Sequence, residues 1–321
     1  MPPNGASAHR DLDARAFLAC AVLSFIWGLQ QTAIKGAAPD IDPTLQVGLR
    51  SGIAALLLIL ANVLFLHEKW SRTVRLRDAL LVGLGFTGEF FFVSEGLRFT
   101  TASHMSVLLY TAPLFAAVGL SIKLPEERLS ALQWLGLLTA FVGIVTAFLV
   151  PALIGGTDRG EGSSLWLFGD FLGLCSGLSW GLTTIFLRTT TMNDAPPSQM
   201  LFWQLAAAFA ILTPFALATG QTHFALTPVS TASLLFQTLI VSFASYLVWN
   251  ALLKRYLAAR LGILVFMTPF FGVILSVALL GETVGAPFVA GCLLVLAGLL
   301  LVQHRSTAAF IRALLRRSEK R

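Results

Sequence analysis

An acidic side chain inside a long apolar segment is the clearest candidate for chemistry in this sequence. Glu89 stands mid-segment, and Gly85, Phe92 and Gly96 share its face at helical spacing. An ionisable group at the centre of a bilayer costs about 2.5 kcal/mol or more, so Glu89 must face protein or water. A buried carboxyl group tends to hold its proton, as a proton-exchanging residue must for part of its cycle. Glu89 is therefore predicted to exchange protons, with a protonated, hydrogen-bonded structural acid as the alternative.

A second set of candidates forms a polar and aromatic stripe in a later apolar segment. Ser242, Ser245, Tyr246, Trp249 and Asn250 recur at spacings that place them on one face of a helix. A helix that faces only lipid would be uniformly aliphatic, so the stripe is predicted to face a cavity. Hydrogen bonding between helices is the alternative for each polar member.

The first and sixth apolar segments carry related side chains. Trp27 and Gln31 lie in the first, and Trp180 and Thr183 lie in the sixth. Interhelical hydrogen bonding explains each polar residue alone, and packing explains each tryptophan alone. Because several segments carry such groups, a shared ligand site is predicted. Its residues are Trp27, Gln31, Glu89, Trp180, Thr183, Ser245, Tyr246, Trp249 and Asn250, with Glu89 as the coupling residue.

Four further residues stand out within the apolar segments. Pro113 and Pro269 should each break a helix inside its span, and they are predicted to be gating kinks. Arg50 lies about one turn inside a helix end, so it is predicted to have a structural role and to extend to the membrane interface. His104 is interpreted as a capping or packing residue rather than a proton relay.

The composition identifies the solvent around these segments. Hydrophobic residues make up 56% of the chain and charged residues 12%, whereas soluble domains carry about 25% charged residues. Most of the surface must therefore face lipid. The net charge is +6, but the basic residues lie between the apolar segments and are not interleaved with exposed aromatic residues. No nucleic-acid partner is therefore predicted. Cys20, Cys175 and Cys292 stand alone in apolar runs, and neither a metal nor a cofactor is predicted.

Ten apolar stretches are long enough to span a bilayer. They are 14–36, 44–66, 77–98, 102–122, 130–150, 164–187, 198–218, 231–253, 259–280 and 284–303. Ten spans put both termini on one side of the membrane. With the N-terminus in the cytoplasm, 18 of the 22 Lys and Arg residues are inside and 3 are outside. The positive-inside rule then predicts a multi-pass protein of the cell membrane, the inner membrane in a bacterium, with both termini cytoplasmic.

The two halves of the chain share an ordered series of motifs. The matches are Trp27-Gly28 with Trp180-Gly181, Thr111-Ala112-Pro113 with Met267-Thr268-Pro269, Pro125-Glu126 with Gly281-Glu282, and Gly136 and Gly143 with Gly291 and Gly298. Five spans per copy is an odd number, so the second copy must be inverted. The predicted fold is an all-α integral membrane protein of ten transmembrane helices in two inverted five-helix repeats. Inverted repeats are typical of secondary transporters with a midplane site.

This organisation divides the chain into four segments. They are a cytoplasmic N-terminal segment at 1–13, five-helix repeats at 14–150 and 164–303, and a basic cytoplasmic tail at 304–321. In the tail, apolar and basic side chains alternate with helical spacing, which fits an interfacial amphipathic helix or a solvated basic tail equally well.

With these motifs the sequence resembles the drug/metabolite transporter superfamily, and within it the EamA-type transporters, over about residues 14–303. Arg50 and the corner acids Glu126 and Glu282 belong to the resemblance. Two features depart from it, because Trp203 stands where the second half would match Arg50 and the first corner carries an extra acid, Glu127. The resemblance implies a secondary active transporter of a small organic solute (amino acid, metabolite or drug), with export coupled to the proton gradient as the expected direction.

Other classes of membrane protein lack their signatures here. The sequence contains no GxxxxGK[ST] loop for a pump and no HExxH or GxSxG motif for a hydrolase. No enzyme activity is predicted, and an integral membrane enzyme, a channel or a structural membrane protein are the alternatives. The expected partners are a small-molecule substrate and the lipid bilayer. The sequence leaves open whether the chain forms a homodimer.

Overall fold

The computed structural model describes residues 14–123, 129–150, 165–255, 265 and 267–302. In these ranges the regular structure is helical, apart from one isolated antiparallel bridge between Ile41 and Phe224. The predicted N-terminal segment, the Pro125-Glu126 corner and the basic tail lie outside the described residues.

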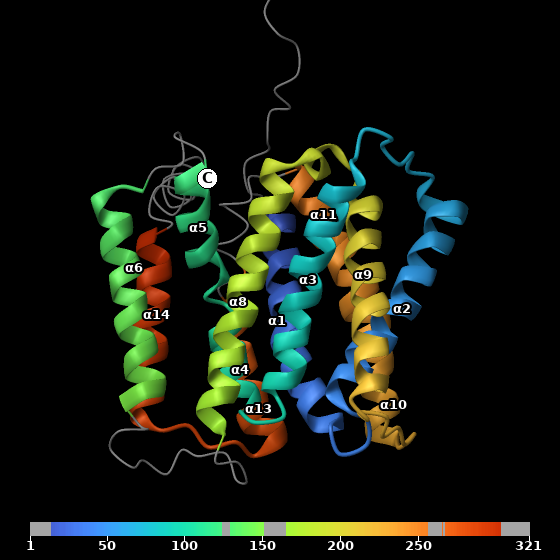
Figure 1. The fold of residues 1–321 in the computed structure, drawn as a ribbon. Helices are drawn as coiled ribbons and strands as arrows, with labels where there is room; N and C mark the ends of the chain where they lie inside the picture. Colours follow the sequence, from blue (N-terminus) through green and yellow to red (C-terminus); the bar gives the residue numbers. More distant parts are fainter. Residues whose placement is uncertain (1–13, 124–128, 151–164, 256–264, 266, 303–321) are drawn as a thin grey trace, which may run out of the picture.

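The helices form a bundle and run roughly in parallel or antiparallel directions (Figure 1). Those of the first half are α1 (Ala14–Ala37), α2 (Pro43–Ala61) continued by the π-helical turn η1 (Asn62–Leu66), α3 (Leu76–Gly96), α4 (Ala102–Leu109), α5 (Ala112–Lys123) and α6 (Ala131–Ile144) continued by η3 (Val145–Leu149). Those of the second half are α8 (Trp166–Thr189), the short η4 (Thr191–Asp194), α9 (Pro197–Ala218), α10 (Pro228–Leu235) continued by η5 (Phe236–Ser245) and α11 (Tyr246–Arg255), α13 (Met267–Leu280) and α14 (Ala286–Val302).

Several helices begin where the sequence signals a start. Pro43, Pro197 and Pro228 each occupy the first helical position, where the missing N–H costs no hydrogen bond. At the start of α6, the Gln133 side chain accepts a hydrogen bond from the Ser130 backbone N–H at 2.9 Å, half of a capping box. These caps matter because helix ends within or near a membrane have little water to satisfy them.

Several of the described helical segments are long and apolar enough to cross a membrane. Six spans of 22 to 25 residues pass this test, and α4 and α5 together form one of them. Large apolar side chains cover the outside of the bundle, as shown by Leu56, which is 68% exposed, and Ile122, which is 76% exposed. Such a surface is stable against lipid and not against water. The structure is that of a multi-pass membrane protein.

The fourth span is interrupted. α4 ends at Leu109 and α5 begins at Ala112, so Pro113 lies at the second position of a new helix. α13 begins at Met267, and Pro269 is its third residue. The helix break predicted at Pro113 is therefore confirmed, and it lies just before the proline, where the missing N–H is tolerated. Residues 256–264 and 266, just before α13, lie outside the described ranges, so the break at Pro269 stays a prediction. The gating role of the two prolines stays a prediction.

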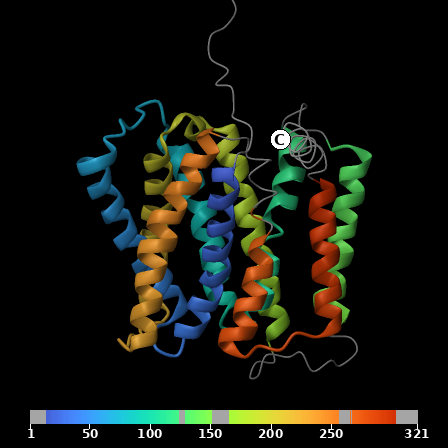
Figure 2. The same ribbon diagram turned by 180° about the vertical axis from the view of Figure 1, so that it is seen from behind.

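The packing of the helices has the two-fold relation that inverted repeats require. α6 packs on α14 at one side of the bundle and α2 packs on α9 at the other side, with α1, α3 and α8 between the two pairs (Figures 1 and 2). The contact of α1 with α13 has its counterpart in the contact of α8 with α5. A Cβ atom on Gly28 would lie 2.7 Å from the Phe271 Cβ, and one on Gly181 would lie 2.8 Å from the Phe115 Cβ. The glycines of the Trp-Gly motifs thus permit equivalent close approaches.

Matched glycines also form the seam between α6 and α14. A Cβ on Gly143 would lie 2.7 Å from the Gly291 carbonyl oxygen, and one on Gly136 would lie equally close to the Gly298 carbonyl oxygen. Small residues at seven-residue spacing let the two backbones approach each other in the membrane. The seven-residue glycine pattern therefore has a packing cause.

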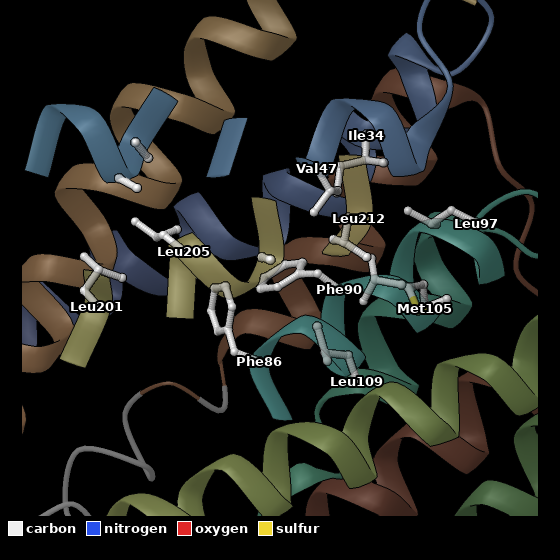
Figure 3. Packing of buried hydrophobic residues seen from close by; sticks show 14 of the residues in the cluster. Ile34, Val47, Phe86, Phe90, Leu97, Met105, Leu109, Leu201, Leu205 and Leu212 are labelled. Carbon is white, nitrogen blue, oxygen red and sulfur yellow. The ribbon is translucent and has the colours of Figure 1, made fainter. Parts of the chain in front are cut away.

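The largest apolar cluster surrounds α3. Phe86 and Phe90 of α3 lie among Leu109 of α4 and Leu201 and Leu205 of α9 (Figure 3). Because these neighbours come from both repeats, α3 lies in the interior of the bundle. Glu89, which lies between Phe86 and Phe90 in the sequence, is thereby held away from lipid.

Candidate functional site

The predicted stripe of the eighth span meets the first helix. The Trp27 indole N–H donates to the Ser245 hydroxyl at 2.9 Å. Around the same indole, the Trp249 ring lies edge-on at 5.3 Å and the Tyr246 ring lies at 6.0 Å between centroids. The structure therefore brings together four of the predicted site residues. Their contacts join α1 with α11 and the end of η5.

Tyr246 extends this group to α3. Its ring contacts Phe86 and Phe90, with centroids 5.9 and 6.3 Å apart. Its hydroxyl donates to the Gln30 side-chain oxygen at 3.1 Å. Tyr246, from the second repeat, thus touches two helices of the first repeat. Phe86 and Phe90 are site neighbours that the sequence did not single out.

Glu89 lies in the same interior region and is 7% exposed. No hydrogen bond or ion pair holds its carboxylate within the described part of the chain, and its charge interacts with Arg50, Tyr110 and Tyr246. α8 approaches the Glu89 face of α3 closely, because a Cβ on Gly85 would overlap the Thr183 hydroxyl of α8. The structural hydrogen bond of the alternative interpretation is not found among the described residues.

Arg50 is placed differently from the prediction. It is fully buried, its Nη1 donates to the Gln237 side-chain oxygen at 3.1 Å, and its guanidinium stacks 4.4 Å from the centre of the Phe90 ring. Its Nε–H has no acceptor in the described structure. The predicted extension to the interface is wrong, because Gln237 and the aromatic ring provide a polar and cation-binding environment inside the bundle.

A chain of side-chain amides fixes that environment. The Gln237 amide donates to the Gln46 oxygen and to the Ser233 hydroxyl, both at 2.8 Å. The Gln46 amide in turn donates to the Ile41 carbonyl at 2.8 Å. Because both amide groups have their donors occupied, the Gln237 oxygen is turned towards Arg50. This orientation gives a buried cation one defined acceptor.

Trp180 reaches the same region through Tyr110. The two rings meet edge-on with centroids 5.1 Å apart, and Tyr110 occupies the break between α4 and α5. The Tyr110 hydroxyl interacts with Thr268 near the start of α13. Sequence reasoning missed Tyr110, although it directly precedes the Thr111-Ala112-Pro113 motif. We call Arg50, Glu89, Tyr110 and Tyr246, with the Phe90 ring, the central site.

Three predicted residues have contacts of a local kind. Thr183 donates to the Ser179 carbonyl one turn earlier and packs against Gly85. The Asn250 amide donates to the Tyr246 carbonyl at 2.9 Å, again within one helix. Gln31 is buried, and its side-chain oxygen has no partner among the described residues. Of the three, only Asn250 contacts a residue of the central site, and it does so through the Tyr246 backbone. The role of all three in binding stays a prediction.

A helical bundle of inverted repeats, with a broken span and a buried charged and aromatic centre, defines a membrane transporter architecture. The sequence model of the EamA-like transporter family matches residues 14–149 and 167–303. The chain belongs to this family. The predicted fold class is confirmed, namely an all-α integral membrane protein of ten transmembrane helices in two inverted five-helix repeats.

Relatives of the chain have transporter names. A Salmonella typhimurium protein named "Probable amino-acid metabolite efflux pump" is 28% identical over 295 residues, which cover 88% of this chain and 92% of that protein. The "Uncharacterized transporter YoaV" of Bacillus subtilis is 26% identical over 286 residues, which cover 87% of this chain and 93% of that protein. These names are those of transporters rather than enzymes, and the chain is a membrane transporter.

A solved crystal structure supports the fold independently. It superposes with a TM-score of 0.63 at 19% identity and covers 91% of this chain and 97% of that chain. At this identity the likeness concerns the fold alone.

Proposed function

We propose that this protein is a secondary active exporter of a small organic solute, driven by the proton gradient through alternating access at the central site. The observation that carries the proposal is the Glu89 carboxyl group. It lies buried in the bundle, without a hydrogen bond in the described chain, within electrostatic range of the buried Arg50 cation. An intramembrane acid placed in this way is a candidate for proton coupling.

The coupling follows from the surroundings of Glu89. Burial and the Arg50 cation act on the carboxyl group in opposite senses, so a change in hydration or in the bound solute can move its proton. As the site opens to one side or the other, Glu89 gains or loses water. A proton taken up on one side can thus be released on the other, while the solute moves in the opposite direction.

The side chains of the site favour an amphipathic solute such as an amino acid. Arg50 offers an unpaired Nε–H to a carboxylate, and Glu89 offers a negative charge to an ammonium group. Trp27, Trp180 and Trp249 supply flat apolar surface near these charges. The name of the Salmonella relative supports the same class. A lipophilic drug is the second candidate, because it too would use the aromatic rings.

The cellular placement is also proposed. The distribution of Lys and Arg between the loops supports a cell-membrane protein with both termini in the cytoplasm. The central site lies within one chain, so transport would not require a second copy even if the protein forms a homodimer.

Two measurements on the purified protein test the proposed function. In a thermal-shift screen, a solute at 100 times its dissociation constant should raise the free energy of unfolding by about 2.7 kcal/mol. In proteoliposomes, the same solute should show saturable counterflow. A flux that rises linearly with solute concentration and shows no counterflow would indicate a channel and refute the proposal.

A further inference from the structure

One end of the bundle is closed by a carboxylate from the second repeat. This outer end is where α1 ends and α4 begins, and loop charge predicts that it faces outside. Glu282, in the connection between α13 and α14, accepts hydrogen bonds from the Ala102 N–H at 2.7 Å and the Ser103 N–H at 2.9 Å. It also accepts one from the Ser103 hydroxyl at 2.6 Å. A carboxylate is favoured here because the first N–H groups of α4 have no partner within the helix.

A second acid of the second repeat holds the same segment. Asp170 of α8 accepts a hydrogen bond from the Thr100 hydroxyl, and its carboxylate oxygens lie 3.0 and 3.1 Å from His104 Nδ1. The His104 ring stacks on Phe288 of α14 with centroids 4.8 Å apart. The packing role predicted for His104 is therefore observed. Its pairing with Asp170 was not predicted from the sequence.

Behind these acids, α4 packs directly on α13. The Ser103 and Ser276 hydroxyl oxygens lie 2.9 Å apart. One turn further along α4, a Cβ on Gly272 would lie 2.4 Å from the Ser106 oxygen. No water or solute can pass between surfaces this close. The outer end is thus shut where α4 meets α13.

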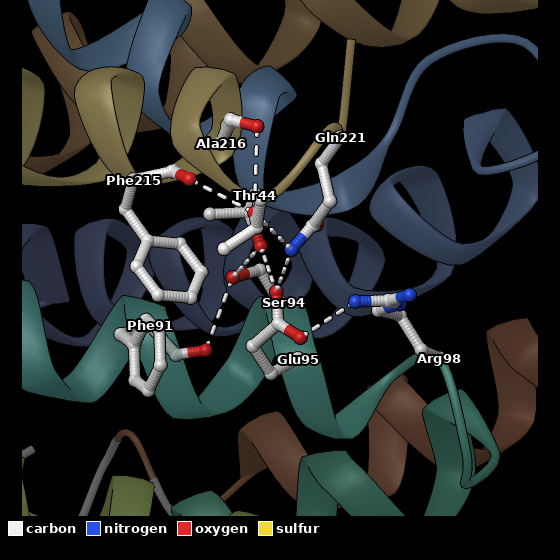
Figure 4. Close-up of polar contacts among 9 residues, drawn as sticks. Thr44, Phe91, Ser94, Glu95, Arg98, Phe215, Ala216 and Gln221 are labelled. Carbon is white, nitrogen blue, oxygen red and sulfur yellow. Dashed lines mark hydrogen bonds and ion pairs between the residues drawn. The ribbon is translucent and has the colours of Figure 1, made fainter. Parts of the chain in front are cut away.

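Other contacts between the repeats occur at both ends of the bundle. At the outer end, Glu95 accepts a hydrogen bond from the Gln221 amide at 2.8 Å (Figure 4). At the opposite end, Glu68 of the first repeat accepts one from the Ser198 N–H of α9 at 3.0 Å. Contacts present at both ends in one conformation do not distinguish the ends. They form a fixed scaffold around α2 and α9.

The Glu282 contact differs from the scaffold contacts. In the sequence, Gly281-Glu282 matches the Pro125-Glu126 corner, which lies outside the described residues. We propose that Glu282 is an outer latch, which holds α4 against α13 and must release the first N–H groups of α4 before the site can open outward. This inference rests on the alternating access of the proposed function.

Cysteine labelling tests the latch without any substrate. The reporter is Ser106→Cys in a chain lacking Cys20, Cys175 and Cys292. Ser106 is 1% exposed and its hydroxyl has no partner in the described structure, so the reporter loses no hydrogen bond. An impermeant maleimide is applied from the face on which Thr222→Cys reacts. Glu282→Ala should raise the labelling rate about tenfold, equivalent to 1.4 kcal/mol in favour of the open form.

The matched control is Glu95→Ala, which removes another acid that joins the two repeats at the outer end and should leave the rate unchanged. Equal rates for Glu282→Ala and the parent would overturn the proposal. If Glu282→Ala does not fold, Glu282→Gln keeps the side-chain volume and should raise the rate in the same direction, and no increase there would also overturn it.

A cross-link provides a second test. Cysteines at Ser103 and Ser276 should form a disulfide, because the two hydroxyl oxygens are 2.9 Å apart. Oxidation should abolish counterflow and a reductant should restore it. Full counterflow in the oxidised, cross-linked protein would show that the α4–α13 contact is no gate. Absence of counterflow in the reduced and parent proteins would count against the proposed function, while the labelling test would still decide on the latch.

Discussion

The proton-coupling role of Glu89 can be tested by Glu89→Gln. The glutamine keeps the size and hydrogen-bonding capacity of the protonated acid. Because the Glu89 carboxylate accepts no hydrogen bond from the described residues, the change should alter the free energy of unfolding by less than about 1 kcal/mol. Solute binding and equal-pH counterflow should therefore persist. Only movement that requires a proton to leave the site should fail.

The size of the effect follows from the driving force. A gradient of one pH unit supplies about 1.4 kcal/mol per proton, which can support about tenfold accumulation of a solute exchanged for one proton. In proteoliposomes with this gradient, the parent should approach tenfold accumulation and Glu89→Gln should stay near the level of protein-free vesicles. Glu95→Gln, on the same helix but outside the central site, should accumulate solute like the parent. Tenfold accumulation by Glu89→Gln would refute the assignment and leave Glu89 a structural acid.

Three further predictions concern the binding wall, the packing and the topology. Trp249→Ala should reduce counterflow about tenfold, because it removes a ring contact worth about 1–1.5 kcal/mol. The control is Val248→Ala, at a residue 44% exposed on the same helix, which should leave counterflow unchanged. Equal losses of counterflow in the two variants would exclude the stripe as a binding wall. Gly143→Leu should lower stability in detergent by about 1–3 kcal/mol, measured by thermal unfolding, and an unchanged stability would contradict the close seam of α6 and α14. In a cysteine-free background, Thr222→Cys should react with an impermeant reagent on intact cells and Ser71→Cys should not, and the reverse pattern would overturn the orientation.

The parts of the fold that the sequence predicted are those set by local rules. A long apolar run must be a span, a proline must interrupt its helix, and glycines seven residues apart must lie on one helix face. The break before Pro113 and the glycine seam at Gly143 and Gly291 are therefore where the sequence predicted them. Because the patterns recur in both halves, the chain contains two copies of one unit. Each copy has five spans, an odd number, so the second copy must be inverted in the membrane.

The parts that the sequence did not predict depend on partners far along the chain. Arg50 was expected at the interface because its position within α2 alone suggested access to water. It is buried because Gln237, 187 residues later, supplies an acceptor. Asp170 and His104 are 66 residues apart and belong to different repeats. A single sequence does not say which polar residue will meet which across a bundle, although the types of the residues indicate that such partners are needed.

Helix α4 connects the region of Glu89, the proposed coupling residue, with Glu282, the proposed latch. Tyr110 occupies the break between α4 and α5, where its charge environment includes Glu89 and its hydroxyl interacts with Thr268 of α13. α4 begins eight residues earlier, at the N–H groups that Glu282 binds. α4 is short: Glu282 binds its first N–H groups, and Tyr110, next to the proposed proton site, follows its last residue. A change in the Glu89 charge therefore acts on one end of a helix whose other end closes the outer face. This arrangement gives a physical route by which proton binding at the centre could favour release of the latch, with α2 and α9 held as the fixed scaffold.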